Sequence, residues 1–191
     1  MGKLIYSMMV SLDGYMEDAD GGFDWGNPDD ECHAFINANL APIGTYLYGR
    51  RIYEVMSFWE PDLIPPDMPP VALEFAEIWR AADKVVFSST LERPVGERTT
   101  IVREFEADVV RGLKEESDRD LTIEGPTLAA HAIRAGLVDE FQLFVVPVVL
   151  GGGKKFFPSG VRTDLRLLDS RTFPSGIAFQ RYAVKRDDSS P

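Results

Sequence analysis

Apolar positions along the chain follow two patterns that alternate. Short runs rich in β-branched and aromatic residues predict buried strands. These runs lie near residues 3–10, 45–48, 84–87, 99–102 and 121–123. Apolar residues three and four positions apart predict amphipathic helices. This spacing occurs near residues 28–40, 52–56, 71–79, 109–116 and 126–135. Strands that alternate with helices indicate an α/β fold with a mostly parallel sheet.

Two further runs near the C-terminus have no helix between them. Residues 165–168 and 177–184 alternate between apolar and polar, which predicts an antiparallel strand pair at one end of the sheet. No break in composition divides residues 1–186, so we expect one domain with a central mixed sheet flanked by helices. We expect residues 187–191 to form a disordered tail.

The segment between residues 121 and 157 has the sharpest element boundaries. After a short apolar run, Gly125 and Pro126 stop the strand, and Pro126 suits the first position of a helix because its missing N–H is not needed there. Gly136 is placed for a left-handed cap at the end of that helix. Residues 141–150 then predict the next strand. The junction of strand and helix leaves free N–H groups at a helix N-terminus, which commonly bind dinucleotide phosphates.

Three predicted strands end at similar turns, each with glycine, hydroxyl or basic residues. In open α/β sheets ligands bind beyond the carboxyl ends of the strands, so we expect these turns to converge on one ligand. Arg50 and Arg51 would supply positive charge for a phosphate. The candidate ligand-binding residues are Gly49, Arg50, Arg51, Ser88, Ser89, Thr90, Gly125, Pro126 and Thr127. The alternative for any single turn is a structural role, because Gly, Ser and Thr favour such turns.

The long connection after the first strand is a candidate functional loop. Asn27 is expected to cap a helix that begins at Pro28. The carboxyl group of Asp30, screened from water by Trp25, would help to protonate a substrate. The alternative is that Asp30 and its acidic neighbours only favour the helix dipole. Asp13 has two similar interpretations, as a turn residue or as a polar anchor beside the ligand.

Composition and charge narrow the classes of function. The chain has 191 residues and a formal net charge of −11, which argues against a nucleic-acid partner because such binding depends on cationic contacts. Cys32 is the only cysteine, and His33 and His131 show no metal-ligand spacing, so we predict no catalytic metal. No apolar run approaches the ~20 residues that span a bilayer, and residues 1–10 lack the pattern of a signal peptide. The default expectation is a soluble cytoplasmic protein with a small-molecule substrate and no membrane partner.

Three stretches of the sequence resemble the dihydrofolate-reductase-like proteins. They are YSMMVSLDGYM from residue 6, YGRRIYE from residue 48, and EGPTLAAHAIRAGLVDEFQLFVVPVVLGGGKKFF from residue 124. The most similar branch is typified by the reductase domain of the bifunctional riboflavin-biosynthesis deaminase/reductase. The resemblance covers nearly the whole chain. It implies a dihydrofolate-reductase-like fold, NADPH as cofactor, and a homodimer contact through residues 141–150, although a buried central strand would explain that apolar run equally well.

The resemblance also assigns roles to single residues. Gly49 and Arg50 would contact cofactor phosphates, and Ser88 and Ser89 would contact the adenosine ribose or its 2′-phosphate. The pyrophosphate-binding turn would comprise Gly125, Pro126, Thr127 and Leu128.

On the substrate side, the W-x-x-P-x-D pattern that starts at Trp25 is similar to dihydrofolate reductase itself, so Asp30 would face the substrate. Asp13 would lie beside the nicotinamide and the substrate. Two positions depart from the family pattern: Glu124 stands where a first glycine is usual, and Ser89 stands where many relatives carry an arginine.

The leading hypothesis is an NADPH-dependent reductase that transfers a hydride to a small polar heterocycle or to an imine or carbonyl substrate. A pterin or a riboflavin-precursor-like compound would fit, and NADH stays open as the cofactor. The alternative hypothesis is a non-catalytic binding protein that kept the fold, because Glu124 and Ser89 depart from the cofactor-binding pattern.

Overall fold

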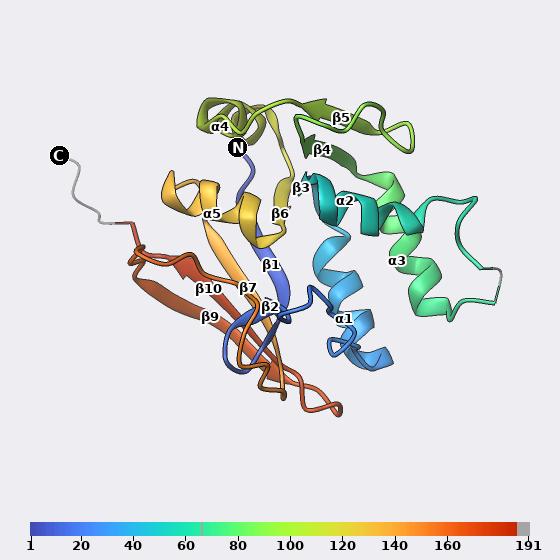
Figure 1. Cartoon of the computed structure of the whole chain (residues 1–191), viewed down its shortest axis with the longest axis vertical. Coiled ribbons are helices and arrows are strands. Elements are labelled where there is room, and N and C mark those ends of the chain that lie inside the picture. The colour runs from blue at the N-terminus through green and yellow to red at the C-terminus, as the bar shows by residue number, and fades with distance from the viewer. Residues whose placement is uncertain (66, 187–191) are drawn as a thin grey trace.

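A computed structural model describes residues 1–65 and 67–186 of the chain. Its centre is an eight-stranded sheet with the strand order β5-β4-β3-β6-β1-β7-β10-β9 (Figure 1). The strands are β1 (Leu4–Ser11), β3 (Ile43–Gly49), β4 (Asp83–Phe87), β5 (Thr99–Val102), β6 (Asp120–Glu124), β7 (Glu140–Val146), β9 (Leu165–Thr172) and β10 (Ala178–Val184). A small second sheet pairs β2 (Tyr15–Glu17) with β8 (Lys154–Lys155). The tail expected at residues 187–191 lies outside the described residues.

The pairing of the strands confirms the α/β fold class. Neighbours from β5 through β7 are parallel, whereas β10 runs antiparallel to both β7 and β9. The sheet is therefore mostly parallel with an antiparallel C-terminal pair, as the sequence predicts. Strand β7 lies between β1 and β10, and this central position accounts for its apolar composition without a second subunit.

Helices cover both faces of the sheet (Figure 1). The helices are α1 (Asp30–Leu40), α2 (Arg50–Met56), α3 (Pro70–Ala81), α4 (Ala107–Glu116) and α5 (Pro126–Arg134), and a 3₁₀ turn η1 (Ser57–Trp59) follows α2. Alternate residues of β1 face opposite layers. Ile5 packs in a cluster with α1 and α3, whereas Leu4 and Tyr6 pack with α4 and α5. This alternation follows from the two-residue repeat of a strand.

Both ends of α5 agree with the sequence prediction. Pro126 is the first helical residue, and Gly125 before it has φ +93°. Gly136 has φ +66°, and its N–H donates to the carbonyl of Ile133 at 3.0 Å. The N–H of Leu137 donates to Ala132 at 3.0 Å, so the last helical carbonyls have partners.

Two boundaries differ from the prediction. Helix α1 begins at Asp30 rather than Pro28, because Asp29 is the residue that caps it, with its carboxylate accepting the N–H of Cys32 at 2.7 Å. Asn27 instead donates to the carbonyl of Asp24. Strand β7 ends at Val146 rather than residue 150, since the next residue is a proline, which cannot donate to a ladder.

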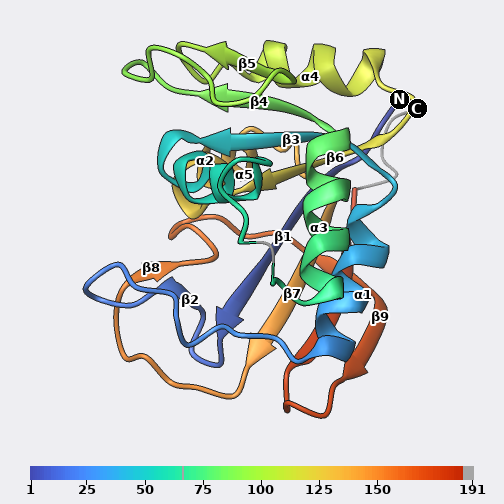
Figure 2. The ribbon, with the colours of Figure 1, turned by 90° about the vertical axis from the view of Figure 1, so that its right-hand side faces the viewer.

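The pairing of β2 with β8 was not predicted, because both strands are short and lie in segments rich in turn residues. Figure 2 shows this small sheet beside the ends of the parallel strands. Gly153 has φ +121°, and a Cβ there would lie 1.8 Å from the carbonyl oxygen of Glu17. The glycine-rich loop is therefore needed for close packing against β2.

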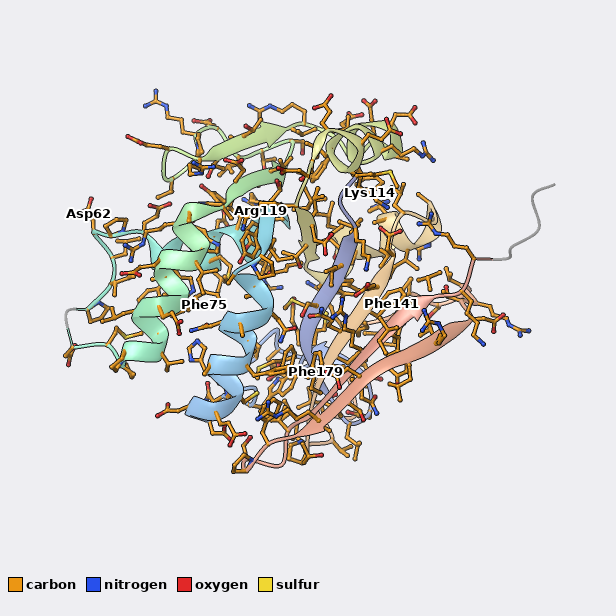
Figure 3. The ribbon with its side chains drawn as sticks, turned by 180° about the vertical axis from the view of Figure 1, so that it is seen from behind. Asp62, Phe75, Lys114, Arg119, Phe141 and Phe179 are labelled. Carbon is orange, nitrogen blue, oxygen red and sulfur yellow. The ribbon has the colours of Figure 1, made fainter. Side chains whose placement is uncertain are left out.

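Two basic residues connect segments at the amino ends of the strands, and Figure 3 labels both. Lys114 of α4 is buried, and its ammonium donates to the carbonyl of Leu137 at 2.8 Å and lies 2.6 Å from the carboxylate of Asp139. The same carboxylate accepts the N–H of Leu4 at 2.8 Å. Arg119 donates to three carbonyls between α1 and β3. These contacts lie at the amino ends of the strands, away from the candidate site.

Candidate functional site

A cavity of about 720 Å³ lies at the carboxyl ends of the parallel strands. The turns after β3, β4 and β6 all line it, as the sequence analysis expected. The predicted ligand-binding residues in its lining are Gly49, Arg50, Arg51, Ser88, Ser89, Thr90, Gly125, Pro126, Thr127 and Leu128. In Figure 1, α2 follows β3 and α5 follows β6, and these two strands are neighbours in the sheet. The structure therefore brings the ten residues together.

The turn at Gly125 leaves room for the backbone to approach a ligand closely. With φ +93°, Gly125 adopts a conformation that other residues rarely adopt, and a Cβ there would lie 3.3 Å from Cγ2 of Ile52. The helix that follows has free N–H groups in its first turn, where Thr127 and Leu128 line the cavity. An anion is favoured at this point by both the N–H groups and the helix dipole.

Three arginines contribute positive charge to this half of the cavity. Arg50 is half-exposed and makes only a long ion pair of 3.7 Å with Glu54, so its guanidinium is available to a ligand. Arg51 is more constrained, because it pairs with Glu17 at 3.0 Å and donates to the carbonyl of Gly21. It holds the β2 segment against α2. Arg103, which directly follows β5, also lines the cavity.

Arg103 is a residue that the sequence analysis missed. One nitrogen of its guanidinium donates to the carbonyls of Leu91 at 2.7 Å and Ser88 at 3.3 Å, which fixes the side chain beside the β4 turn. The remaining N–H groups stay available to a ligand. The sequence signal was an arginine immediately after the short run 99–102, but that run alone does not show which strand it pairs with.

The serine at the end of β4 organises its own turn. Ser88 is buried, and its hydroxyl oxygen accepts the N–H groups of Thr90 at 3.2 Å and Leu91 at 2.9 Å. Ser89 and Thr90 are exposed and line the cavity. Ser88 therefore shapes the turn, and the two following hydroxyl groups face the space that a ligand would take.

The other half of the cavity is apolar and lies between the sheet and helices α1 and α3. Its walls come from β1, β7, the two helices and the loop before α1. The main wall residues are Met9, Trp25, Ile36, Leu40, Phe75 and Phe144. These side chains belong to two contiguous apolar clusters of the core. Trp25, predicted as a substrate-binding residue together with Asp30, lines this half of the cavity, and its role in binding stays a prediction.

Glu124 is the acidic group that reaches this apolar half. It is 7% exposed and lines the cavity, and its carboxyl group makes no hydrogen bond to another described residue. Burial raises its pKa to about 8. In the parallel ladder it lies beside Tyr48, on the sheet face that packs against α3 and opposite the face covered by α5. A carboxyl group with this pKa is largely protonated at neutral pH.

The two aspartates predicted as catalytic do not line the cavity. Asp30 is exposed on the first turn of α1. Asp13 is exposed and ties the end of β1 to the glycine-rich loop: it accepts the hydroxyl of Ser11 at 2.7 Å and the N–H groups of Leu150 at 3.1 Å and Gly151 at 2.7 Å. The hydrogen bond from Ser11, followed by those of the two amides, lowers the pKa of Asp13. The acidic side chains that line the cavity therefore come from β6 (Glu124) and β2 (Glu17), not from α1.

Comparison with known proteins agrees with this architecture. Residues 2–179 match the family model described as the RibD C-terminal domain. The chain belongs to this family. It is 32% identical over 182 residues to the uncharacterized protein YyaP of Bacillus subtilis, a match that covers 92% of this chain and 91% of the relative. The uncharacterized protein YwjB of the same organism is 27% identical over 192 residues, covering 96% and 98% of the two chains.

Solved structures show the same RibD-like dihydrofolate-reductase fold. A putative riboflavin biosynthesis protein from Shewanella sp. PV-4 has a TM-score of 0.75 at 22% identity, covering 97% of this chain and 100% of its own. RibD of Acinetobacter baumannii has a TM-score of 0.71 at 18% identity, covering 97% of this chain and 58% of its own. A deaminase/5-amino-6-(5-phosphoribosylamino)uracil reductase from Thermotoga maritima has a TM-score of 0.64 at 12% identity, covering 96% and 57%.

In this RibD-family chain, the described residues contain no group of three or more His, Cys, Asp or Glu side chains that could hold a metal ion. None of the helices in residues 1–65 and 67–186 is long and apolar enough to cross a membrane. His131 is exposed, lines the cavity and stacks on Phe105, with the ring centroids 5.4 Å apart. His33 packs near Phe75, and burial lowers its pKa.

Proposed function

We propose that this protein is an NADPH-dependent reductase that transfers a hydride to a polarised double bond of a small heterocyclic, imine or carbonyl substrate. The observation that carries the proposal is the two-part cavity. One half has glycine turns, helix N-termini and arginines at three strand ends, and the other half is apolar with the buried carboxyl group of Glu124. Membership of the RibD C-terminal domain family, whose neighbours include a named reductase, supports this reaction type.

The residues at the strand ends fit a dinucleotide. The glycine turn of α5 would hold the pyrophosphate, because Gly125 presents backbone rather than side chain to the cavity. Arg50 would neutralise a phosphate charge beside it. Arg103, with the hydroxyl groups of Ser89 and Thr90, would bind the 2′-phosphate, which is the group that distinguishes NADPH from NADH. This arrangement supplies a cation even though Ser89 replaces the arginine common among relatives.

Glu124 would complete the chemistry on the substrate side. The reduced nicotinamide supplies the hydride, and the substrate must take up one proton for the reduction to be complete. The carboxyl group of Glu124 is mostly protonated at neutral pH because burial raises its pKa to about 8. It would hydrogen-bond a heteroatom of the substrate and donate the proton there, while the apolar walls exclude water.

The departure at Glu124 does not argue against cofactor binding. Its carboxyl group lies on the sheet face opposite α5, so it does not compete with a pyrophosphate at the α5 turn. A non-catalytic binding protein would have the same cavity. The two hypotheses differ in one prediction, because the reductase must bind a reduced nicotinamide nucleotide and the non-catalytic protein need not.

Titration with NADPH and NADH, followed by nicotinamide fluorescence, tests the proposal. We expect saturable binding of NADPH. In Arg50→Ala the affinity should fall by about 10–100-fold, because a charge-assisted contact to phosphate contributes on the order of 1.5–3 kcal/mol. Arg166→Ala is a matched control, since Arg166 is exposed on β9 and does not line the cavity. Absence of binding for both nucleotides would refute the reductase and leave the non-catalytic alternative.

A further inference from the structure

Positive charge in the cavity is confined to one of its halves. Within the described chain, the Arg and Lys residues of the lining are Arg50, Arg51, Arg103 and Lys154. Two of them belong to α2 and one follows β5. Lys154 of β8 also borders a shallow pocket with Pro126 and Thr127 at the start of α5. All four therefore lie on the side where the strands end.

Several of these cations already have partners. Glu17 pairs with both Arg51 at 3.0 Å and Lys154 at 3.2 Å. Arg103 donates to two backbone carbonyls. If the nucleotide takes Arg50 and Arg103, the remaining cations of the described lining, Arg51 and Lys154, share the carboxylate of Glu17 and are held on β2, away from the apolar half.

The apolar half offers a different kind of surface. Its polar side chains are those of Glu124 and Ser7. These residues are neighbours on the adjacent strands β6 and β1, because each comes directly after one member of the pair Ile123 and Tyr6. Around them are the methionine and aromatic walls described above. The mouth is apolar as well, since Phe23 and Val55 line the cavity and are 48% and 40% exposed.

An anionic substrate group would be disfavoured in this half. Transferring a phosphate or carboxylate from water to an apolar surface without a cationic partner is costly. Glu124 would repel it when ionised. Methionine sulfur and aromatic side chains instead make favourable contacts with planar rings. A protonated carboxyl group can both donate and accept, which matches a neutral amide-like edge.

We propose that the apolar half selects an uncharged, planar heteroaromatic substrate, with one amide-like edge toward Glu124 and Ser7 and no phosphate. This inference rests on the proposed reductase function and specifies its substrate class. It separates this chain from a reductase of phosphoribosyl compounds, the activity named for the Thermotoga maritima neighbour.

The test compares two forms of one ring by isothermal titration calorimetry of the full chain saturated with NADP⁺. The probes are quinoxalin-2-one, which is neutral and has an amide-like edge, and quinoxalin-2-one-6-carboxylate, which carries one negative charge. We expect the neutral ring to bind more tightly by about tenfold or more, because the carboxylate must lose water without gaining a cation.

A matched pair of variants locates the effect. Phe23→Lys places an ammonium group at the mouth and should reduce the preference for the neutral ring. Val149→Lys makes the same change of charge at an exposed position outside the cavity lining, so the preference should stay as in the unmodified chain. Both positions are exposed, and neither variant removes a buried side chain.

The outcomes separate the substrate class from the proposed function. If NADP⁺ and NADPH do not bind, the reductase proposal fails, and the ring comparison is made without nucleotide. If the nucleotide binds but the carboxylate binds as tightly as the neutral ring, or neither ring binds, the proposed substrate class is refuted. An equal change of preference in Phe23→Lys and Val149→Lys would also refute it.

Discussion

Glu124 makes the stability of the protein depend on pH in a defined direction. Its pKa is about 8 in the folded chain and has the ordinary value of 4.5 when exposed. An acid with a raised folded-state pKa stabilises the fold below its unfolded pKa, and this contribution is lost as pH rises through the folded pKa. Since each unit is worth about 1.4 kcal/mol, the free energy of unfolding should fall by a few kcal/mol between pH 4.5 and pH 8.

Urea denaturation of the unmodified chain and of Glu124→Gln, at pH 5 and at pH 9, measures this contribution. Glutamine keeps the shape and cannot ionise, so the variant should lose less stability between the two pH values. We expect it to be the more stable protein at pH 9. The same pH dependence in both proteins would show that Glu124 does not carry the raised pKa.

Arg103 should determine which nicotinamide nucleotide is preferred. Arg103→Ala removes the cation proposed for the 2′-phosphate and should weaken NADPH binding by about 10–100-fold, because charge-assisted hydrogen bonds contribute on the order of 1.5–3 kcal/mol. NADH has no such phosphate, and its affinity should stay unchanged. The fluorescence titration checks both values. An equal loss for the two nucleotides would instead indicate that Arg103 only supports the β4 turn through Ser88 and Leu91.

Individual residues show which parts of the site could be predicted from sequence. Gly125 and Arg50 carry local signals, a positive-φ turn and a charge at a strand end, and both line the cavity. Asp30 matched a motif, but the orientation of its side chain depends on how α1 packs, and it is exposed. The sequence shows Glu124 only as a departure from the family's glycine pattern. Its proposed role as a proton donor depends on which face of β6 packs against α3. Such facts come from tertiary packing, which short patterns do not encode.

At the scale of elements, prediction succeeded where both ends of an element carried a stop signal. Helix α5 has proline at its start and glycine after its end, and its bounds match. Two good capping residues, Asn27 and Asp29, lie two positions apart before helix α1. The choice between them depends on a tertiary contact, because the carboxylate of Asp29 also accepts the N–H of Ser175 at 2.7 Å. The β2–β8 pair joins segments far apart in the chain, so no local signal indicates it.

The glycine before α5 should be required for nucleotide binding as well as for stability. Gly125→Ala places a Cβ 3.3 Å from Ile52 at φ +93° and ψ 127°, a backbone conformation that should cost about 1–3 kcal/mol of stability for a residue other than glycine. It should also weaken NADPH binding, because the turn would shift. Gly136→Ala at the other end of α5 is the control, since it also introduces a Cβ at a positive φ, +66°, with nothing within 4 Å and away from the cavity lining. Equal NADPH affinity in both variants would argue against a pyrophosphate site at this turn.

At the scale of the whole molecule, stabilising contacts and the candidate site lie at opposite ends of the strands of one sheet. Buried Lys114 pairs with the partly buried Asp139 at the amino ends of β1 and β7, together with Leu4 and the carbonyl of Leu137. The cavity lies at the carboxyl ends. This separation allows the strand-end turns to carry glycine and unpaired charge, because contacts at the opposite end hold the strands together.

Lys114→Met should therefore lower stability without changing the site. It removes the bonds of the ammonium to Asp139 and to the carbonyl of Leu137, while Asp139 keeps Arg186 and the N–H of Leu4 as partners, so the loss should be about 1.5–3 kcal/mol. Lys185→Met removes an exposed lysine and should change stability little. Urea denaturation measures the first effect, and the dissociation constant of NADPH, taken where each variant is fully folded, measures the second. If the folded Lys114→Met variant bound NADPH more weakly, the two ends of the strands would be energetically coupled. The site would then depend on packing along the whole length of the strands.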